Sequence, residues 1–324
     1  MKTETSSKIQ EYIRDHRQAT AKELANFLKI SPQALFRQLA KLQEKDIIKK
    51  IGRPPRVFYF IKEQTVKTDV ALQAGLKKII DAEYLIITPT GERKVGADGF
   101  VYWCHKTHQP IEKTAQEYVD TWKSCNKYRK NGLIDGTSKL NSTFQNTFLD
   151  KLFYIDFYSI ERFGKTKLGQ LLLYGKQSQN KKMIQEIIDL VQPYLTDLVK
   201  KYNIDGIGFI PPTVKREVQF MTVLERELQL KAHIIPIIKL KTEVVVPQKT
   251  LNKLEDRIEN AQKTIIVQAN AQYKNILLID DAVGSGATLN ETAQQIRVNG
   301  ICSGKIIGLA LTGSFKGFDV ISEV

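Results

Sequence analysis

The chain has 324 residues, enough for two or three domains and at least one sizeable core. Lys and Arg number 49 against 35 Asp and Glu, and the net charge of +14 favours polyanionic partners. Since no apolar run reaches the roughly 18 residues that span a bilayer and the segment MKTETSSKIQEY lacks a signal-peptide core, we expect neither a membrane nor a secreted protein. Three cysteines, an odd number, fit a reducing compartment, so the expected location is cytoplasmic.

Residues 1–62 concentrate the positive charge, with 14 Lys and Arg against 6 Asp and Glu. Apolar residues at helical spacing predict a helix over residues 7–17. A second helix is predicted from about Ala21 to Ile30, because Thr20 and Glu23 have the spacing of a capping box. Its expected apolar side consists of Leu24, Ala25, Phe27 and Leu28.

A third helix is predicted from Pro32 to about Lys45, with Ser31 as its N-cap. The residues that it is expected to bury are Leu35, Phe36, Leu39 and Leu42. The outward side chains have the length and polarity to reach base edges or phosphates, and they are Gln33, Arg37, Gln38 and Lys41. The pattern therefore predicts a DNA-recognition helix.

Two β-rich runs follow, IIKK and RVFYFI, joined by Gly52-Arg-Pro-Pro55. With the three helices they resemble a winged helix-turn-helix domain, mostly helical, whose wing tip would place Arg53 or Arg56 against the minor groove or the backbone. The basic excess and the wing together predict that residues 1–62 bind duplex DNA. The alternative is a protein-interaction module with a solvated basic face.

Residues 63–149 are predicted to connect two larger parts. The segment 66–82 is apolar at helical spacing and would be a linker helix or a dimerisation helix, the latter making a homodimer. A β-hairpin is expected from residues 84–88 and 100–103, a helix over 111–129, and a loop over 127–143.

Four potential metal ligands stand in this connecting segment, namely Cys104, His105, His108 and Cys125. Their spacing, C-H-x2-H-x16-C, differs from the paired CxxC and C2H2 arrangements of zinc sites. The adjacent Cys104 and His105 are also awkward for tetrahedral coordination by both. A degenerate zinc ribbon is conceivable, but the spacing favours the absence of a zinc site.

From residue 150 onward, apolar runs alternate with amphipathic segments. Strands are predicted at residues 152–157, 204–210, 233–238, 276–279 and 306–311, and helices at 182–201, 221–230, 251–261 and 288–298. The alternation predicts an α/β domain over residues 150–324, with a mostly parallel sheet and a ligand site at the carboxyl ends of its strands.

The segment ILLIDDAVGSGATL, residues 276–289, carries the clearest sign of function. A buried strand is followed by Asp280 and Asp281, and a turn then enters a helix through Gly284, Ser285, Gly286, Ala287 and Thr288. The N–H groups of a helix N-terminus favour a phosphate, and two carboxylates can accept hydrogen bonds from ribose hydroxyls. We therefore expect a phosphorylated ribose here. The alternative is an ordinary strand-turn-helix capped by its aspartates.

This segment resembles the motif of type I phosphoribosyltransferases that binds 5-phosphoribosyl 1-pyrophosphate (PRPP). The resemblance implies the fold of that family, ribose binding by Asp280 and Asp281, 5′-phosphate binding by Ser285 to Thr288, and Mg²⁺ as the companion of PRPP. Ser285 stands where threonine is usual, which keeps the hydroxyl.

A wider resemblance, over about residues 150–313, is to the ComF-like branch of that family. It rests on FYSIERFGKTKLGQLLLYGK and on PQKTLNKLEDRIENA. In the second stretch, Gln248, Arg257 and Asn260 would belong to a mobile lid over the ligand or lie on a solvated helix face. ComF proteins usually begin with a CxxC zinc ribbon, which a winged-helix pattern replaces in this chain.

The chain departs from the family after its second strand. In place of a basic R-G-F-N-Q run it has Arg216-Glu-Val-Gln-Phe220. By the resemblance, Lys215 and Arg216 could meet pyrophosphate, whereas Glu217 would oppose it.

Three functions are compatible with these patterns. The first is a DNA-binding transcription regulator whose phosphoribosyltransferase-type domain senses PRPP or a nucleotide, a pairing known from the purine repressor family. The second is an active phosphoribosyltransferase that joins PRPP to a nitrogenous base. The third, by analogy with ComF, is a role in DNA uptake or processing. No residue stands out as a general base for catalysis. No loop that would select the nitrogenous base can be identified from the sequence, so the identity of that substrate is not predicted.

Overall fold

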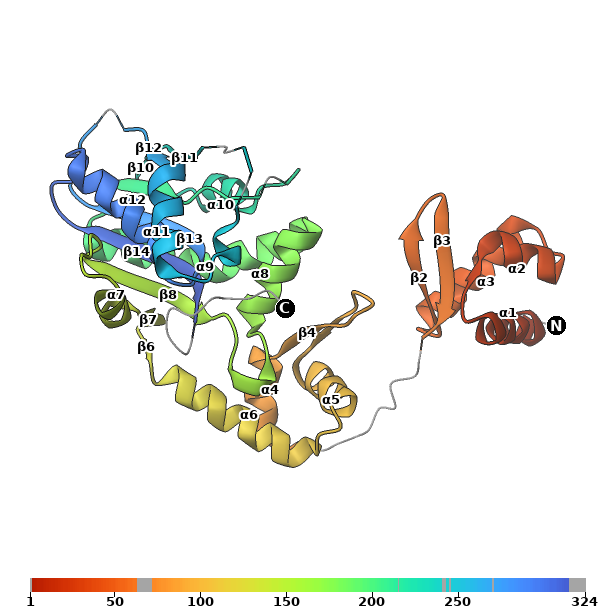
Figure 1. Cartoon of the computed structure of the whole chain (residues 1–324). Coiled ribbons are helices and arrows are strands. Elements are labelled where there is room, and N and C mark those ends of the chain that lie inside the picture. Colours follow the sequence, from red (N-terminus) through yellow and green to blue (C-terminus); the bar gives the residue numbers. More distant parts are fainter. Residues whose placement is uncertain are drawn as a thin grey trace. The chain divides into compact units, whose positions relative to one another are not determined.

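The computed structural model describes residues 2–62, 72–214, 216–240, 243–244, 246–269 and 271–314 (Figure 1). The chain divides into two compact units, Met1–Ala71 and Leu72–Val324. Within the described ranges, no helix has the length and apolar character that crossing a membrane requires.

The first unit combines helices with a small antiparallel sheet. Its elements are α1 (Lys2–His16), β1 (Ala19–Thr20), α2 (Ala21–Leu28), α3 (Pro32–Glu44), β2 (Ile48–Arg53) and β3 (Arg56–Ile61). The sheet order is β1-β3-β2, and the β2-β3 pairing runs from Ile48 opposite Ile61 to Arg53 opposite Arg56. The three predicted helices and the wing are confirmed, and β1 is an addition that the sequence did not indicate.

Local sequence explains where α2 and α3 begin. The hydroxyl oxygen of Thr20 accepts a hydrogen bond from the Glu23 N–H at 3.3 Å, and the Glu23 carboxylate accepts one from the Thr20 N–H at 2.6 Å. This is the predicted capping box. Ser31 accepts a hydrogen bond from the Ala34 N–H at 3.3 Å, with Pro32 in the first turn. Both caps satisfy N–H groups that have no partner inside the helix.

A compact core holds the first unit together, and it contains Ile9, Ile13, Ala19, Leu24, Leu35, Leu39, Leu42, Ile48 and Tyr59. Two expected members are absent from it, since Phe27 is 51% exposed and Phe36 52% exposed. Phe36 lies one residue off the stripe of α3 that faces the core, and a domain this small cannot cover every aromatic ring. Phe27 instead packs on Tyr12, with ring centroids 4.6 Å apart.

The second unit begins with residues that were expected to form a connection. Its first elements are α4 (Ala74–Glu83), β4 (Leu85–Ile87), β5 (Arg93–Val95), α5 (Gly96–Lys106) and α6 (Ile111–Asn126). Residues 66–71 of the predicted linker helix, 66–82, lie outside the described residues. The predicted hairpin exists, but its second strand is β5, and residues 100–103 belong to α5. The prediction was wrong because Phe100 packs as a helical residue against Tyr84 and Tyr118, a contact that local sequence does not show.

The predicted loop over residues 127–143 is wrong as well. It contains β6 (Arg129–Lys130), β7 (Leu133–Asp135) and α7 (Thr137–Thr143). β7 pairs antiparallel with the central sheet through Ile134 opposite Tyr154. Strand β7 obtains backbone hydrogen bonds from β8, a partner that its own short sequence does not show, so local propensity could not reveal it.

The centre of the second unit is a sheet of seven strands within the described residues, in the order β10-β9-β13-β14-β8-β7-β6. Its long strands are parallel, as predicted, while β7 and β6 are antiparallel at one edge. The remaining strands of this sheet are β8 (Lys151–Phe157), β9 (Gly206–Phe209), β10 (His233–Ile234), β13 (Ile276–Val283) and β14 (Ile306–Gly313). A separate antiparallel pair consists of β11 (Ile237–Lys239) and β12 (Ile265–Val267). The predicted strand 233–238 is thus divided between two sheets, at Pro236, which has no N–H for a ladder.

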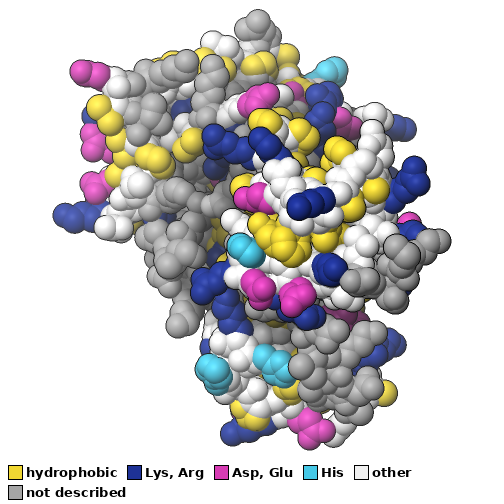
Figure 2. Space-filling view, turned by 90° about the vertical axis from the view of Figure 1, so that its right-hand side faces the viewer, with side chains coloured by type: hydrophobic (Ala, Val, Ile, Leu, Met, Phe, Trp, Pro, Cys, Tyr) yellow, Lys and Arg dark blue, Asp and Glu magenta, His cyan; other side chains and the backbone are white. Residues whose placement is uncertain are grey.

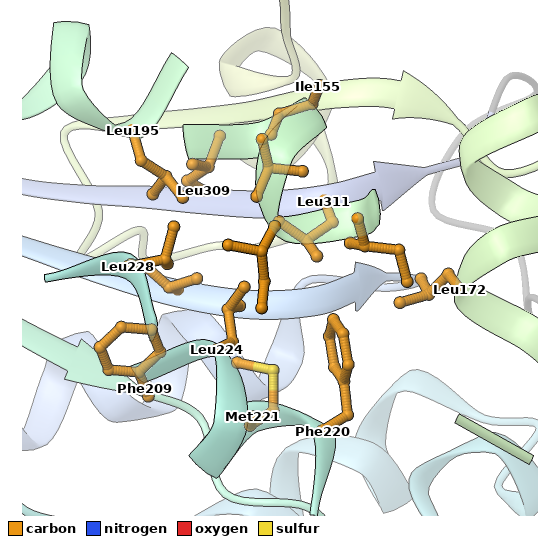
Figure 3. Packing of buried hydrophobic residues seen from close by; sticks show 14 of the residues in the cluster. Ile155, Leu172, Leu195, Phe209, Phe220, Met221, Leu224, Leu228, Leu309 and Leu311 are labelled. Atoms are coloured by element: carbon orange, nitrogen blue, oxygen red, sulfur yellow. The ribbon is translucent and has the colours of Figure 1, made fainter. Parts of the chain in front are cut away.

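Helices cover both faces of the central sheet (Figure 1). They are α8 (Lys167–Ser178), α9 (Lys181–Tyr202), α10 (Phe220–Leu228), α11 (Leu254–Thr264) and α12 (Ala287–Val298), with 3-10 turns η1 (Glu161–Phe163) and η2 (Gln248–Thr250). Right-handed crossovers put α8, α9 and α10 on one face and α12 on the other. Figure 3 shows Phe220, Met221, Leu224 and Leu228 of α10 in the larger core, which also contains Leu309 and Leu311 of β14. Helix α8 was not predicted as a separate element.

Candidate functional site

A cavity of about 230 Å³ opens where β9 and β13 end. Its wall includes residues 280–289, which cover the end of β13, the following turn and the start of α12. The charged and amide side chains that join them are Lys176, Arg216, Lys239, Gln248 and Arg257. A ligand was expected at this place, because it is where the parallel strands have their carboxyl ends.

The two aspartates lie inside β13, which continues to Val283 rather than ending at Ile279 as predicted. The Asp280 carboxylate accepts a hydrogen bond from the N–H of Asp281 at 2.8 Å. The Asp281 carboxylate forms an ion pair with the ammonium group of Lys176, which reaches it from α8. Both side chains of this pair are only about one fifth exposed, 20% for Lys176 and 19% for Asp281.

Electrostatics at the pair favour a protonated Asp280. Burial, and then the neighbouring Asp281 carboxylate, raise the pKa of Asp280 to about 7, against the opposing effect of Lys176 and Lys239. Burial lowers the pKa of Lys239, and Asp280 opposes that shift. The Lys239 ammonium group donates a hydrogen bond to the Thr213 hydroxyl oxygen at 2.9 Å. A charged Asp280 is therefore costly in this cavity.

The turn into α12 forms the opposite side of the cavity. Gly286 is the N-cap of α12 with φ of +80°, a conformation that favours glycine. Ser285 is buried, and its hydroxyl oxygen accepts a hydrogen bond from the Ala287 N–H at 3.3 Å. The first turn of α12, residues 287–289, lines the cavity, and the N–H groups of a helix N-terminus favour an anion.

Gln248, Arg257 and Asn260 come together beside this turn. The Gln248 amide nitrogen donates hydrogen bonds to the Arg257 carbonyl oxygen at 3.0 Å and to the Asn260 side-chain oxygen at 3.1 Å. Arg257 is 5% exposed, and its Nε donates to the Leu251 carbonyl oxygen at 2.8 Å. Its buried Nη2 has no hydrogen-bond partner among the described residues, and burial lowers the pKa of its guanidinium. Arg257 is thus a buried cavity residue and does not lie on a solvated helix face.

The segment that departs from the phosphoribosyltransferase pattern, Arg216 to Phe220, borders the cavity at Arg216. Arg216 lines the cavity, whereas Glu217 is exposed, so the carboxylate expected to oppose pyrophosphate lies at the surface. Lys215 is outside the described residues.

The candidate metal ligands do not converge. Cys104 and Cys125 are buried in α5 and α6, and burial raises the pKa of each thiol to about 11. His105 and His108 are exposed. In the described part of the chain, no group of three or more His, Cys, Asp or Glu side chains could hold a metal ion.

The candidate DNA-binding residues lie on α3 and the wing. Gln33, Arg37, Lys41 and Arg56 are exposed, and Gln38 is half-buried. The side chain of Arg53 is outside what the structure describes. Lys and Arg side chains are spread over the face seen in Figure 2, among exposed hydrophobic side chains. Sequence reasoning missed exposed Phe36, because its hydrophobicity suggested the core.

Comparison with known proteins bears on the first unit. A family model described as winged helix-turn-helix DNA-binding matches residues 2–49, from α1 to the beginning of β2. The first unit is therefore a winged helix-turn-helix domain of the DNA-binding class. No curated protein matches the chain.

Proposed function

We propose that this protein is a transcription regulator in which the winged helix binds duplex DNA and the second unit binds a phosphorylated ribose, either PRPP or a nucleotide. The observation that carries the ligand proposal is the cavity that joins the Asp280–Asp281 pair to the N-terminus of α12. Carboxylates accept hydrogen bonds from ribose hydroxyls, and helix N–H groups bind a phosphate. The resemblance to phosphoribosyltransferases supports the same assignment.

Charge in the cavity supports an anionic ligand. Its basic side chains are Lys176, Arg216, Lys239 and Arg257, and its acidic side chains are Asp280 and Asp281. The cationic groups outnumber the anionic groups even when both aspartates are ionised. Arg257 Nη2 has no hydrogen-bond partner in the described part of the chain, and it would donate a charge-assisted hydrogen bond to a phosphate oxygen.

Regulation requires that the ligand change the affinity for DNA. If the ligand changes the affinity of the protein for DNA by a given factor, thermodynamic linkage requires that DNA change the affinity of the protein for the ligand by the same factor. The proposal therefore predicts a reciprocal effect that can be measured from either side.

An active phosphoribosyltransferase is the second candidate, and one observation favours it: Arg216 lines the cavity while Glu217 is exposed. In this reaction a nitrogenous base displaces pyrophosphate from the ribose C1, and the residues of the chain would position PRPP and stabilise the departing charge. Arg216 and Arg257 are the candidates for the pyrophosphate.

The test is a fluorescence-anisotropy titration of labelled duplex DNA with the full chain, with and without PRPP. A change in DNA affinity of about threefold or more, together with no pyrophosphate release in the presence of a panel of nucleobases, would support the regulator. Rapid PRPP-dependent pyrophosphate release would select the transferase. Absence of duplex binding at low salt would refute the regulator and leave the first unit as a protein-interaction module.

A further inference from the structure

Lys176 contacts one of the two carboxylates that would bind the ribose of the proposed ligand. It comes from the last turn of α8, more than 100 residues before Asp281, and its ammonium group contacts the Asp281 carboxylate directly. The exposed fractions of about one fifth show that the pair is largely removed from solvent. An ion pair in such surroundings is only weakly screened by salt.

Lys239 makes the same end of the cavity more cationic. It reaches the cavity wall from β11, is anchored by its hydrogen bond to Thr213, and interacts electrostatically with Asp280. Two lysines from different elements therefore face two adjacent aspartates. The protein itself therefore supplies positive charge beside both aspartates.

The resemblance to phosphoribosyltransferases implies Mg²⁺, and these residues do not fit a divalent cation at the pair. Mg²⁺ takes oxygen ligands in near-octahedral geometry and retains several waters. A carboxylate that is already paired with an ammonium group offers less negative charge to a metal, and a nearby second lysine repels it.

We propose that Lys176 takes the place of the divalent cation at the Asp280–Asp281 pair, so that this cavity binds phosphorylated ribose without a metal ion. The inference rests on the proposed ligand class and narrows it. Lys176 neutralises Asp281 and leaves its remaining oxygen lone pairs available to ribose hydroxyls. The ammonium group also reduces the repulsion between the carboxylates and the ligand phosphate.

The experiment is isothermal calorimetry of ribose 5-phosphate binding to the full chain, in excess EDTA and in excess Mg²⁺. We expect the two affinities to agree within about threefold. For Lys176→Met we expect a loss of about thirtyfold or more in EDTA, since one partner of a largely buried charge pair is removed, with substantial recovery in Mg²⁺. Lys176→Arg keeps the charge and should remain independent of Mg²⁺. Lys182→Met, at an exposed position of α9, is the matched control and should bind as the wild type does.

The outcomes separate this inference from the proposed function. Binding by the wild type that is more than about tenfold weaker in EDTA than in Mg²⁺ would overturn the role of Lys176 and leave the ligand class intact. Unchanged binding by Lys176→Met in EDTA, with a native fluorescence spectrum, would also overturn it. If ribose 5-phosphate, PRPP and nucleotides all fail to bind in both conditions, the proposed function itself fails.

Discussion

Asp280 is half-buried, and its carboxyl should make the second unit less stable as pH rises. The pKa of this group is raised from 3.8 to about 7 in the folded protein, whereas in the unfolded chain it is near its ordinary value. Between these two pH values the folded state holds a proton that the unfolded state releases, so stability is present below about pH 4 and is lost by about pH 7. At about 1.4 kcal/mol per pKa unit, the full loss is at most about 4 kcal/mol.

Replacing the carboxyl removes this penalty. We expect Asp280→Asn to raise the free energy of unfolding by about 2–4 kcal/mol at pH 8 and to change it little near pH 4, because asparagine has a similar shape and no charge. Asp281→Asn is the matched control at the neighbouring position. It removes the partner of Lys176 and should lower the free energy of unfolding at pH 8.

Urea unfolding followed by tryptophan fluorescence is a suitable assay, because Trp103 and Trp122 both belong to the second unit and the first unit contains no tryptophan. The reasoning would be refuted if Asp280→Asn were no more stable than the wild type at pH 8. It would also be refuted if the stabilisation were equal at pH 5 and pH 8.

Three further changes have defined expectations. Gly169→Ala should lower the free energy of unfolding by about 2 kcal/mol or more, since the added Cβ would lie 2.2 Å from the Tyr158 carbonyl oxygen. Gly175→Ala should lower it less, because its Cβ would meet the end of the Ile187 side chain at 3.3 Å. Urea titration measures both effects. Arg257→Met should weaken PRPP binding about tenfold or more by calorimetry, since Nη2, which makes no hydrogen bond within the described residues, is the donor proposed for a phosphate oxygen. The same change removes the Nε hydrogen bond to the Leu251 carbonyl oxygen, so urea titration should show a modest loss of stability. Arg37→Ala and Arg56→Ala should each reduce the salt dependence of DNA binding by about one phosphate contact in anisotropy titrations at several salt concentrations.

Local signals in the sequence predicted the three helices and the wing of the first unit, and the strand-turn-helix at residues 276–289. The capping box at Thr20 and the proline after Ser31 fix helix starts through contacts within four residues, so no tertiary information was needed. The strand, carboxylates and glycine turn around Asp280 are likewise contiguous in sequence, and their place at the strand ends follows from the parallel topology.

Long-range packing produced what could not be predicted. Strand β7 exists because β8 offers it an edge, and α5 replaces a predicted strand because its aromatic side chains pack on other helices. The ion pair between Lys176 and Asp281 joins α8 to β13, and no periodicity in the sequence connects them. The buried Arg257 was recognisable as a candidate only through the family resemblance, since a charged residue in a polar segment is ordinarily expected at the surface.

Calorimetry with PRPP in Mg²⁺, comparing the wild type with the double variant Asp280→Asn and Asp281→Asn, tests the central claim most directly. We expect a saturable heat of binding for the wild type and none for the double variant. The unfolding transition of the second unit should be retained, because the change removes two acceptors and no core volume. Equal binding by the two proteins, or no binding of PRPP and no binding of nucleotides by the wild type, would contradict it.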